Sequence, residues 1–262
     1  MKVSYFPGCT LKNKAKDLDN YAYKCAEALG VTLEEIENWQ CCGGVFTTSA
    51  DEVATKLSSV RALKEANKKS QPLVTVCSAC HNVIKQTNHQ IQTNEEFKNK
   101  VNRYMNEDEY SGEAEVISYL ELLRDKIGFD KVKEAVKNSL EKKKVAAYYG
   151  CLLLRPASVM KMDNAENPTI MEDLIRALGG EAVLYSMRNE CCGGYISLEN
   201  KNLAAKKSSA VIENAKAAGA EMIITACPLC KYNLEKSGAD IPVVYFTEVL
   251  AEALGVKEDT NA

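Results

Sequence analysis

Short apolar runs alternate with amphipathic stretches along the whole chain. In the C-terminal part these runs predict strands over residues 144–149, 182–185 and 221–226. Helices are predicted between the strands, from Asn167 to Gly179 and over residues 198–218, with Asn167 as the N-cap and Pro168 at the first helical position. Strands that alternate with helices indicate an α/β fold with a small parallel sheet flanked by helices.

The N-terminal part repeats this order of elements. Its strands and helices are predicted over residues 3–6, 21–29, 53–66 and 73–76. Four cysteine positions recur at an offset of 150 residues, and residues 115–123 resemble residues 242–250 at an offset of 127. The first copy therefore carries 23 additional residues, which fall in the polar stretch 86–110. We predict an internal duplication with two pseudo-symmetric domains, residues 1–141 and 142–262.

Ten of the eleven cysteines form one pattern that is used twice: a single Cys, then Cys-Cys-Gly-Gly, then Cys-x-x-Cys. The first set consists of Cys9, Cys41, Cys42, Cys77 and Cys80. The second set consists of Cys151, Cys191, Cys192, Cys227 and Cys230. Only Cys25 lies outside the pattern, in a helical stretch that predicts a buried and inert core thiol. Thiols at matched spacing in two copies indicate a metal-binding or redox site.

Composition and charge narrow the class of protein. At 262 residues, with 46% hydrophobic and 26% charged residues, the chain has the make-up of a soluble globular protein. The net charge of −3, without a long basic block, gives no indication of a nucleic-acid partner. No stretch is apolar enough to span a membrane, and residues 1–9 predict a first strand and not a signal peptide. We therefore expect a cytoplasmic location, where thiols stay reduced and bind metal more readily than they form structural disulfides.

The predicted elements place the cysteines at the carboxyl ends of strands or in the turns that follow. This is the edge where open parallel sheets bind their ligands. A Cys-x-x-Cys motif that leaves a strand and enters a helix has its sulfurs near the helix N-terminus, where the dipole favours the thiolate. The glycine pair after each Cys-Cys allows a tight turn with positive φ.

Five cysteines in each set are more than common metal sites need. A structural zinc site uses four ligands, and so does an ordinary 4Fe-4S cubane. Five thiolates, two of them adjacent, favour an iron-sulfur cluster in which cysteines share or bridge irons. Structural zinc and simple redox thiols are the alternatives.

These motifs resemble the CCG-domain family, and within it the B subunits of heterodisulfide reductases. The resemblance rests on residues 5–9, both Cys-Cys-Gly-Gly turns, both Cys-x-x-Cys motifs and residues 220–230, and it covers nearly the whole chain. It implies two iron-sulfur clusters of the noncubane 4Fe-4S type, one held by the first set and one by the second. It further implies that the clusters face a shared cavity, where each gives one electron to a disulfide and binds one sulfur of the split disulfide.

The turn after the second Cys-Cys-Gly-Gly is shorter than in methanogen members of the family, because Tyr195 follows Gly194 directly. It is similar to that of bacterial relatives that work with flavin-containing subunits on other substrates. The resemblance thus implies a catalytic subunit that reduces a disulfide or a related substrate. The alternative is a non-catalytic electron-relay subunit of a folate-reducing or quinone-linked complex. We expect no flavin or nucleotide on this chain, and electrons from a ferredoxin-like iron-sulfur subunit and a flavoprotein subunit.

Two residues are candidates for catalytic roles. His81 follows Cys80 and can protonate a leaving thiolate or supply a nitrogen ligand, or else it faces solvent. Arg155 lies in the loop after Cys151, which is expected to line the cavity between the halves, and its planar fork suits a substrate carboxylate or phosphate.

Other basic residues are further candidates for substrate binding. Lys231, Lys206 and Lys207 can orient an anionic substrate, but on amphipathic helices such residues more often form a solvated face. His89 is predicted to lie on the surface.

Overall fold

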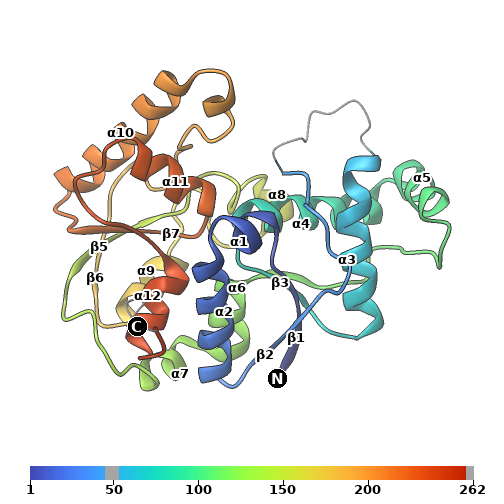
Figure 1. Ribbon diagram of the computed structural model, residues 1–262, viewed down its shortest axis with the longest axis horizontal. Coiled ribbons are helices and arrows are strands. Elements are labelled where there is room, and N and C mark those ends of the chain that lie inside the picture. Colours follow the sequence, from blue (N-terminus) through green and yellow to red (C-terminus); the bar gives the residue numbers. More distant parts are fainter. Residues whose placement is uncertain (45–52, 258–262) are drawn as a thin grey trace.

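The computed structural model describes residues 1–44 and 53–257 and contains two four-stranded sheets, one in each half of the chain (Figure 1). Every strand pair is parallel, and helices flank both sheets. This arrangement confirms the predicted α/β class with two pseudo-symmetric units.

The two sheets have the same strand order. The first runs β2-β1-β3-β4, with β1 at Lys2–Phe6, β2 at Thr32–Glu35, β3 at Leu73–Thr75 and β4 at Val116–Ser118. The second runs β6-β5-β7-β8, with β5 at Lys144–Tyr148, β6 at Glu181–Val183, β7 at Met222–Thr225 and β8 at Val243–Tyr245. Strands β3, β4 and β7 are buried at every residue, as parallel strands covered on both faces should be.

Helices of very different length connect the strands. In the N-terminal half they are α1 (Cys9–Asn13), α2 (Lys16–Ala28), η1 (Ala54–Lys56), α3 (Leu57–Lys68), α4 (Ser78–Thr93), α5 (Glu95–Met105), α6 (Tyr119–Glu121), η2 (Leu122–Ile127) and α7 (Phe129–Glu134). In the C-terminal half they are α8 (Ala157–Met160), α9 (Ile170–Ala177), η3 (Ile196–Leu198), α10 (Lys201–Ala217), α11 (Pro228–Lys236) and α12 (Phe246–Ala253). The elements η1 and η3 are 3-10 turns, and η2 is a π-helix.

The helix predicted to start at Asn167 begins later, at Ile170, so the predicted cap is wrong. The carboxylate of Asp163 accepts hydrogen bonds from the backbone N–H groups of Thr169 and Ile170, at 2.6 and 2.9 Å. Asp163 thus satisfies the free N–H groups of this helix start from a distance in sequence. The Asn167 side chain instead accepts a hydrogen bond from Arg188.

The additional residues of the first copy extend one helix and add another. Helix α4 continues to Thr93, and α5 follows at the right-hand edge of the molecule (Figure 1). The Asn94 side chain caps α5 by accepting from the N–H of Phe97 at 2.9 Å. The insertion is therefore an ordered helical addition to the first half.

Helix α12 of the C-terminal half packs against α2 of the N-terminal half (Figure 1). The Thr247 hydroxyl donates to the Leu18 carbonyl at 3.2 Å, and the Cys25 thiol donates to the Thr247 carbonyl at 3.7 Å. Cys25 is fully buried in this core, which confirms its prediction as a core thiol. One apolar cluster, which includes Leu33 and Leu250, therefore runs through both halves.

The segment between the halves is held mainly by the second one. The backbone N–H groups of Lys137 and Asn138 both donate to the carbonyl of Ala253, and that of Leu140 donates to Leu178. The domain boundary between residues 141 and 142 stays a prediction.

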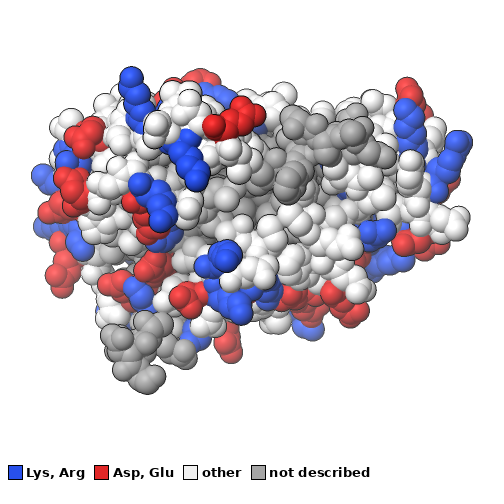
Figure 2. Space-filling model, turned by 45° about the horizontal axis from the view of Figure 1, so that its top comes forward, with Lys and Arg blue, Asp and Glu red and all other residues white. Residues whose placement is uncertain are grey.

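Charged side chains of both signs share the surface. Figure 2 shows lysine and arginine interspersed with aspartate and glutamate around one face, whose middle is largely uncharged. Over residues 1–44 and 53–257, every helix is too short or too polar to cross a membrane.

Candidate metal centre

The lone cysteine of each set follows the central strand of its sheet. Cys9 opens α1 after β1, and Cys151 comes after β5. Each is preceded by a glycine with positive φ, Gly8 at 79° and Gly150 at 62°. A Cβ at Gly8 would lie 2.8 Å from the sulfur of Cys80, and one at Gly150 would lie 3.1 Å from that of Cys230. These glycines let the backbone approach the Cys-x-x-Cys sulfurs closely.

Each Cys-x-x-Cys motif joins a buried strand to a helix, as predicted. Cys77 follows β3 and is the N-cap residue of α4, and Cys227 follows β7 and is the N-cap residue of α11. All four cysteines of the two motifs are buried. Their sulfurs therefore lie at the carboxyl edges of the sheets, at the positive ends of helix dipoles.

Three hydrogen bonds, together with electrostatic interactions between the other neighbouring thiols, link the ten sulfurs in one continuous run. In the first set the order is Cys9, Cys41, Cys42, Cys80 and Cys77. In the second set the order is Cys227, Cys230, Cys192, Cys191 and Cys151. The sulfurs are 3.5 Å apart between Cys9 and Cys41, 3.4 Å between Cys42 and Cys80, and 3.5 Å between Cys192 and Cys230. Within the described ranges, no three His, Cys, Asp or Glu side chains form a group that could hold a single metal ion.

The run crosses from one half to the other between Cys77 and Cys227, where interaction of the two thiols raises the pKa of Cys77 and contributes to the lowered pKa of Cys227. These two cysteines are equivalent positions of the duplication. The rings of Tyr119 and Phe246, another equivalent pair, also meet, with centroids 5.8 Å apart. A residue meets its own equivalent only near the pseudo-twofold axis, so the axis passes between these pairs.

Contact between sulfurs shifts their pKa values in opposite directions. Hydrogen bonding to Cys41 lowers the pKa of Cys42 to about 4, and the same contact raises the pKa of Cys41. In the second set, contact with Cys151 lowers the pKa of Cys191 to about 2, and the pKa of Cys151 rises. Each cysteine with a lowered pKa therefore stands beside cysteines with a raised pKa, because neighbouring thiolates repel each other. A cationic metal centre stabilises adjacent thiolates, so this donor set fits a metal cluster.

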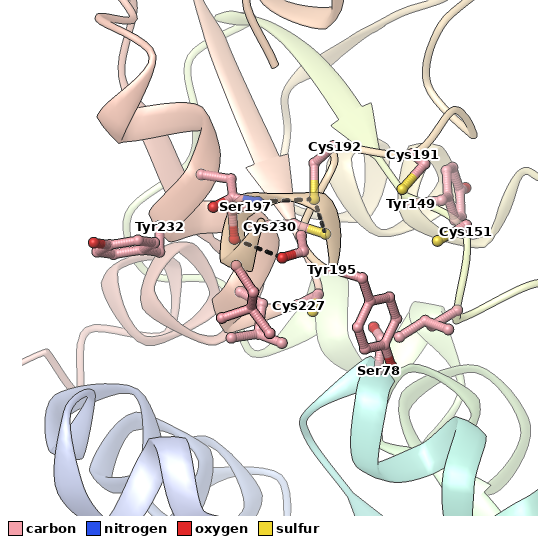
Figure 3. Close-up of a pocket in the computed structure, with 15 residues that line it drawn as sticks. Ser78, Tyr149, Cys151, Cys191, Cys192, Tyr195, Ser197, Cys227, Cys230 and Tyr232 are labelled. Atoms are coloured by element: carbon pink, nitrogen blue, oxygen red, sulfur yellow. Dashed lines mark hydrogen bonds between the residues drawn. The ribbon is translucent and has the colours of Figure 1, made fainter. Parts of the chain in front are cut away.

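One cavity of about 220 Å³ touches all five cysteines of the second set (Figure 3). Its other lining residues are largely apolar or aromatic, including Leu152, Leu229 and Tyr149. Ser78, from the first Cys-x-x-Cys, also lines it, and its hydroxyl donates to the Ala226 carbonyl at 2.7 Å. The N-terminal half thus contributes to the site of the second set.

His81 is fully buried, so the solvent-facing alternative for this residue is wrong. Its Nε2 lies 3.4 Å from Glu121 Oε2, but neither ring nitrogen makes a hydrogen bond in the described structure. Burial, together with the nearby Lys85, lowers the pKa of His81 well below its usual range. The imidazole therefore stays neutral, and its catalytic role stays a prediction.

The Arg155 guanidinium is occupied by a protein carboxylate. It donates to both oxygens of Glu166, at 2.9 and 3.1 Å, and to the Asn189 carbonyl at 3.2 Å. Its neighbour Leu152 lines the cavity of the second set, whereas Arg155 is not among the described residues that line it. Substrate binding by Arg155 stays a prediction, which requires displacement of Glu166.

The remaining basic candidates lie at the surface. Lys206 and Lys207 are exposed on α10, and His89 is exposed as predicted. Lys231 forms an ion pair with Glu235 one helical turn further along α11. None of these four is among the described residues that line the cavity of the second set.

Two residues at the site were missed by the sequence analysis. Tyr195 lines the cavity and donates a hydrogen bond from its hydroxyl to the Gly44 carbonyl of the other half. The Asn82 amide donates to the carbonyls of Leu152 and Arg155, both at 2.7 Å, and so holds the loop after Cys151. Tyr195 was detectable because it directly follows Cys-Cys-Gly-Gly, but Asn82 carries no such signal.

Comparisons with known proteins agree with the duplication. A family model for the CCG cysteine-rich domain matches residues 3–85 and 145–235. The chain is 31% identical to the 8-methylmenaquinol:fumarate reductase membrane anchor subunit of Wolinella succinogenes, over 97% of this chain and 93% of that protein. It is 27% identical to the B subunit of the ferredoxin:CoB-CoM heterodisulfide reductase of Methanosarcina mazei, over 98% and 91% of the two chains.

Two further likenesses are to a heterodisulfide reductase-like protein and to a solved structure. A protein of Archaeoglobus profundus, named as similar to the B subunit of heterodisulfide reductase, is 29% identical, over 97% of this chain and 91% of that protein. The crystal structure of a hypothetical protein from Helicobacter pylori superposes with a TM-score of 0.73 at 12% identity, over 98% of this chain and 49% of that one. That structure supports the fold alone. The sequence matches and the doubled cysteine pattern together show that the chain belongs to the CCG cysteine-rich domain family, with two copies of the domain.

Proposed function

We propose that this chain is the iron-sulfur catalytic subunit of a heterodisulfide reductase-like complex, which reduces a disulfide or a related small molecule. The first and second sets would each hold one noncubane 4Fe-4S cluster. The observation that carries this proposal is the continuous run of ten sulfurs, which crosses between the halves at Cys77 and Cys227. Two redox centres on either side of this point would lie close enough to act on one substrate.

Reduction of a disulfide consumes two electrons and two protons and yields two thiols. When bound, the two clusters would supply one electron each. The cysteines hold the centres, and the largely apolar walls of the cavity limit access of water to them. His81 is buried and its pKa is lowered, so a role as proton donor would require it to receive a proton from solvent or another side chain.

The chain would receive its electrons from a ferredoxin-like iron-sulfur subunit, itself supplied by a flavoprotein subunit. Support comes from its relatives, whose names mark them as subunits of reductases. A thiol-rich site of this kind also suits the reducing cytoplasm.

The first test is the metal content of the full chain purified without air. We expect a brown protein with iron and acid-labile sulfide, and with a paramagnetic signal after oxidation or reduction. A colourless preparation with stoichiometric zinc would overturn the proposal. Reduction of a small symmetric disulfide by the chemically reduced protein then tests the catalytic role.

A second candidate is an electron-relay subunit of a quinone-linked complex. It is favoured by the 31% identity to a subunit of a methylmenaquinol:fumarate reductase. The two candidates differ in what oxidises the reduced protein. Oxidation by a water-soluble naphthoquinone, with no reaction towards disulfides, would decide for the relay.

A further inference from the structure

Tyr195 connects the two Cys-Cys-Gly-Gly turns. It follows the second turn directly, and its hydroxyl donates to the carbonyl of Gly44, the last residue of the first turn. Figure 3 shows the Tyr195 ring directed towards Ser78, between Cys151 and Cys227. A single side chain thus spans the space between the two cysteine sets.

Tyr195 also lies between two cavities. One is the cavity of the second set, and the other, of about 870 Å³, is lined mainly by polar side chains of α4. Among the described residues, only Tyr195 and Leu152 line both. The larger cavity takes its polar character from Asn82, Gln86 and Thr87. The ring of Tyr195 therefore forms part of the wall between an apolar chamber and a polar one.

The electrostatic surroundings place Tyr195 near both sets. Its pKa is raised to about 12, first by burial and then by the charges of Cys151, Cys42, Cys227 and Cys77. Two of these cysteines belong to each set. The hydroxyl is a hydrogen-bond donor to Gly44 and is placed close to both sites.

We propose that Tyr195 is a positioning residue that fixes the two Cys-Cys-Gly-Gly turns relative to each other through Gly44. With Leu152 it also closes the cavity of the second set towards the larger polar cavity. A substrate that reaches both sets from the polar side must displace or pass the ring. This inference rests on the proposed function, since it presupposes a redox centre at each set.

Tyr195→Phe separates the two parts of the proposal, because it removes the hydroxyl and keeps the ring. We expect unchanged iron and sulfide, an altered magnetic interaction between the two reduced centres, and kcat lowered about tenfold, the usual scale for one lost hydrogen bond. KM should change little. Tyr195→Ala also opens the wall, so KM for a bulky disulfide should fall relative to KM for a small one.

Tyr104→Phe is the matched control, because Tyr104 is 60% exposed on α5. Wild-type kcat and an unchanged magnetic interaction in Tyr195→Phe would overturn the inference. Loss of iron from Tyr195→Phe alone would also overturn it, since Tyr195 would then support the binding of the cluster itself. An iron-free wild type would instead refute the proposed function, and the inference with it.

Discussion

The thiols of Cys77 and Cys227 interact at the pseudo-twofold axis, which raises the pKa of Cys77 and helps to lower that of Cys227. Each is the first cysteine of its Cys-x-x-Cys motif and each is buried at the end of a central strand. The duplication therefore brings its two equivalent thiols together, and the two candidate metal sites share a border. A substitution at either cysteine should therefore affect metal binding by both sets.

Replacement of either cysteine at this border should affect more than its own set. We expect Cys77→Ser to lose at least half of the iron and to change the spectrum of the centre that remains. Iron analysis and electron paramagnetic resonance of the anaerobic protein measure both effects. Cys25→Ala is the control, because Cys25 lies in the core between α2 and α12. It should keep all iron and lose about 1 kcal/mol of unfolding free energy. Equal iron loss in both variants would contradict this prediction.

The glycine before Cys9 can be tested against a glycine that also has a positive φ but whose Cβ would have no neighbour. Gly8 and Gly219 have φ of 79° and 89°, and a Cβ at Gly219 would meet no atom within 4 Å. Gly219→Ala should cost about 1 kcal/mol through backbone strain alone. Gly8→Ala should cost at least about 2 kcal/mol and also lower the iron content, because its Cβ displaces the sulfur of Cys80. Denaturant unfolding and iron analysis of both variants check this, and equal costs with full iron in each would refute it.

Arg188 and Glu172 form a buried ion pair with an N–O distance of 3.2 Å. Glu172 also accepts from the Tyr149 hydroxyl, close to Cys151. Arg188→Met leaves a buried carboxylate without its partner and should cost about 3–5 kcal/mol of unfolding free energy. The double variant Glu172→Gln/Arg188→Met should recover most of this loss. A double variant as unstable as Arg188→Met would show that the packing of Arg188 matters and its charge does not.

Glu35 predicts a specific dependence of stability on pH. Burial acts to raise its pKa, but hydrogen bonds from Lys12, Tyr23 and Trp39 outweigh burial and leave the pKa lowered. The folded state therefore holds the charged form, and this stabilisation is present above the unfolded pKa of about 4.3 and lost as pH falls through the lower folded value. The difference in unfolding free energy between wild type and Glu35→Gln should be constant from pH 8 to 6 and shrink below about pH 4. The exposed Glu27→Gln is the control, and a difference that grows on acidification would contradict the assignment.

The sequence predicted those features of the fold that depend on residues close to one another in the chain. The duplication, the parallel strands and the position of each Cys-x-x-Cys at a strand end were all predictable, because apolar runs and motif spacing are local signals. The helix start at Ile170 was not, because its N–H groups are satisfied by Asp163, several residues away. Local patterns suggested Asn167 instead, whose side chain binds Arg188.

Contacts between the two halves could not be predicted from the sequence. That Cys77 meets Cys227 depends on how the two sheets are oriented, and no spacing rule encodes that orientation. The same holds for Tyr195, whose partner Gly44 lies 151 residues away in the chain. For Arg155 the sequence did not reveal that Glu166 binds the guanidinium, so its role in substrate binding stays a prediction.

The packing of α12 against α2 limits where this chain can be divided into fragments that fold on their own. The last helix of the second copy completes the core of the first, through Phe246, Thr247 and Leu250. A fragment that ends at residue 141 would expose the apolar face of α2, and residues 142–262 alone would expose that of α12. Each repeat is therefore an incomplete folding unit, and we expect the two to be soluble and stable only when expressed as one chain or co-expressed.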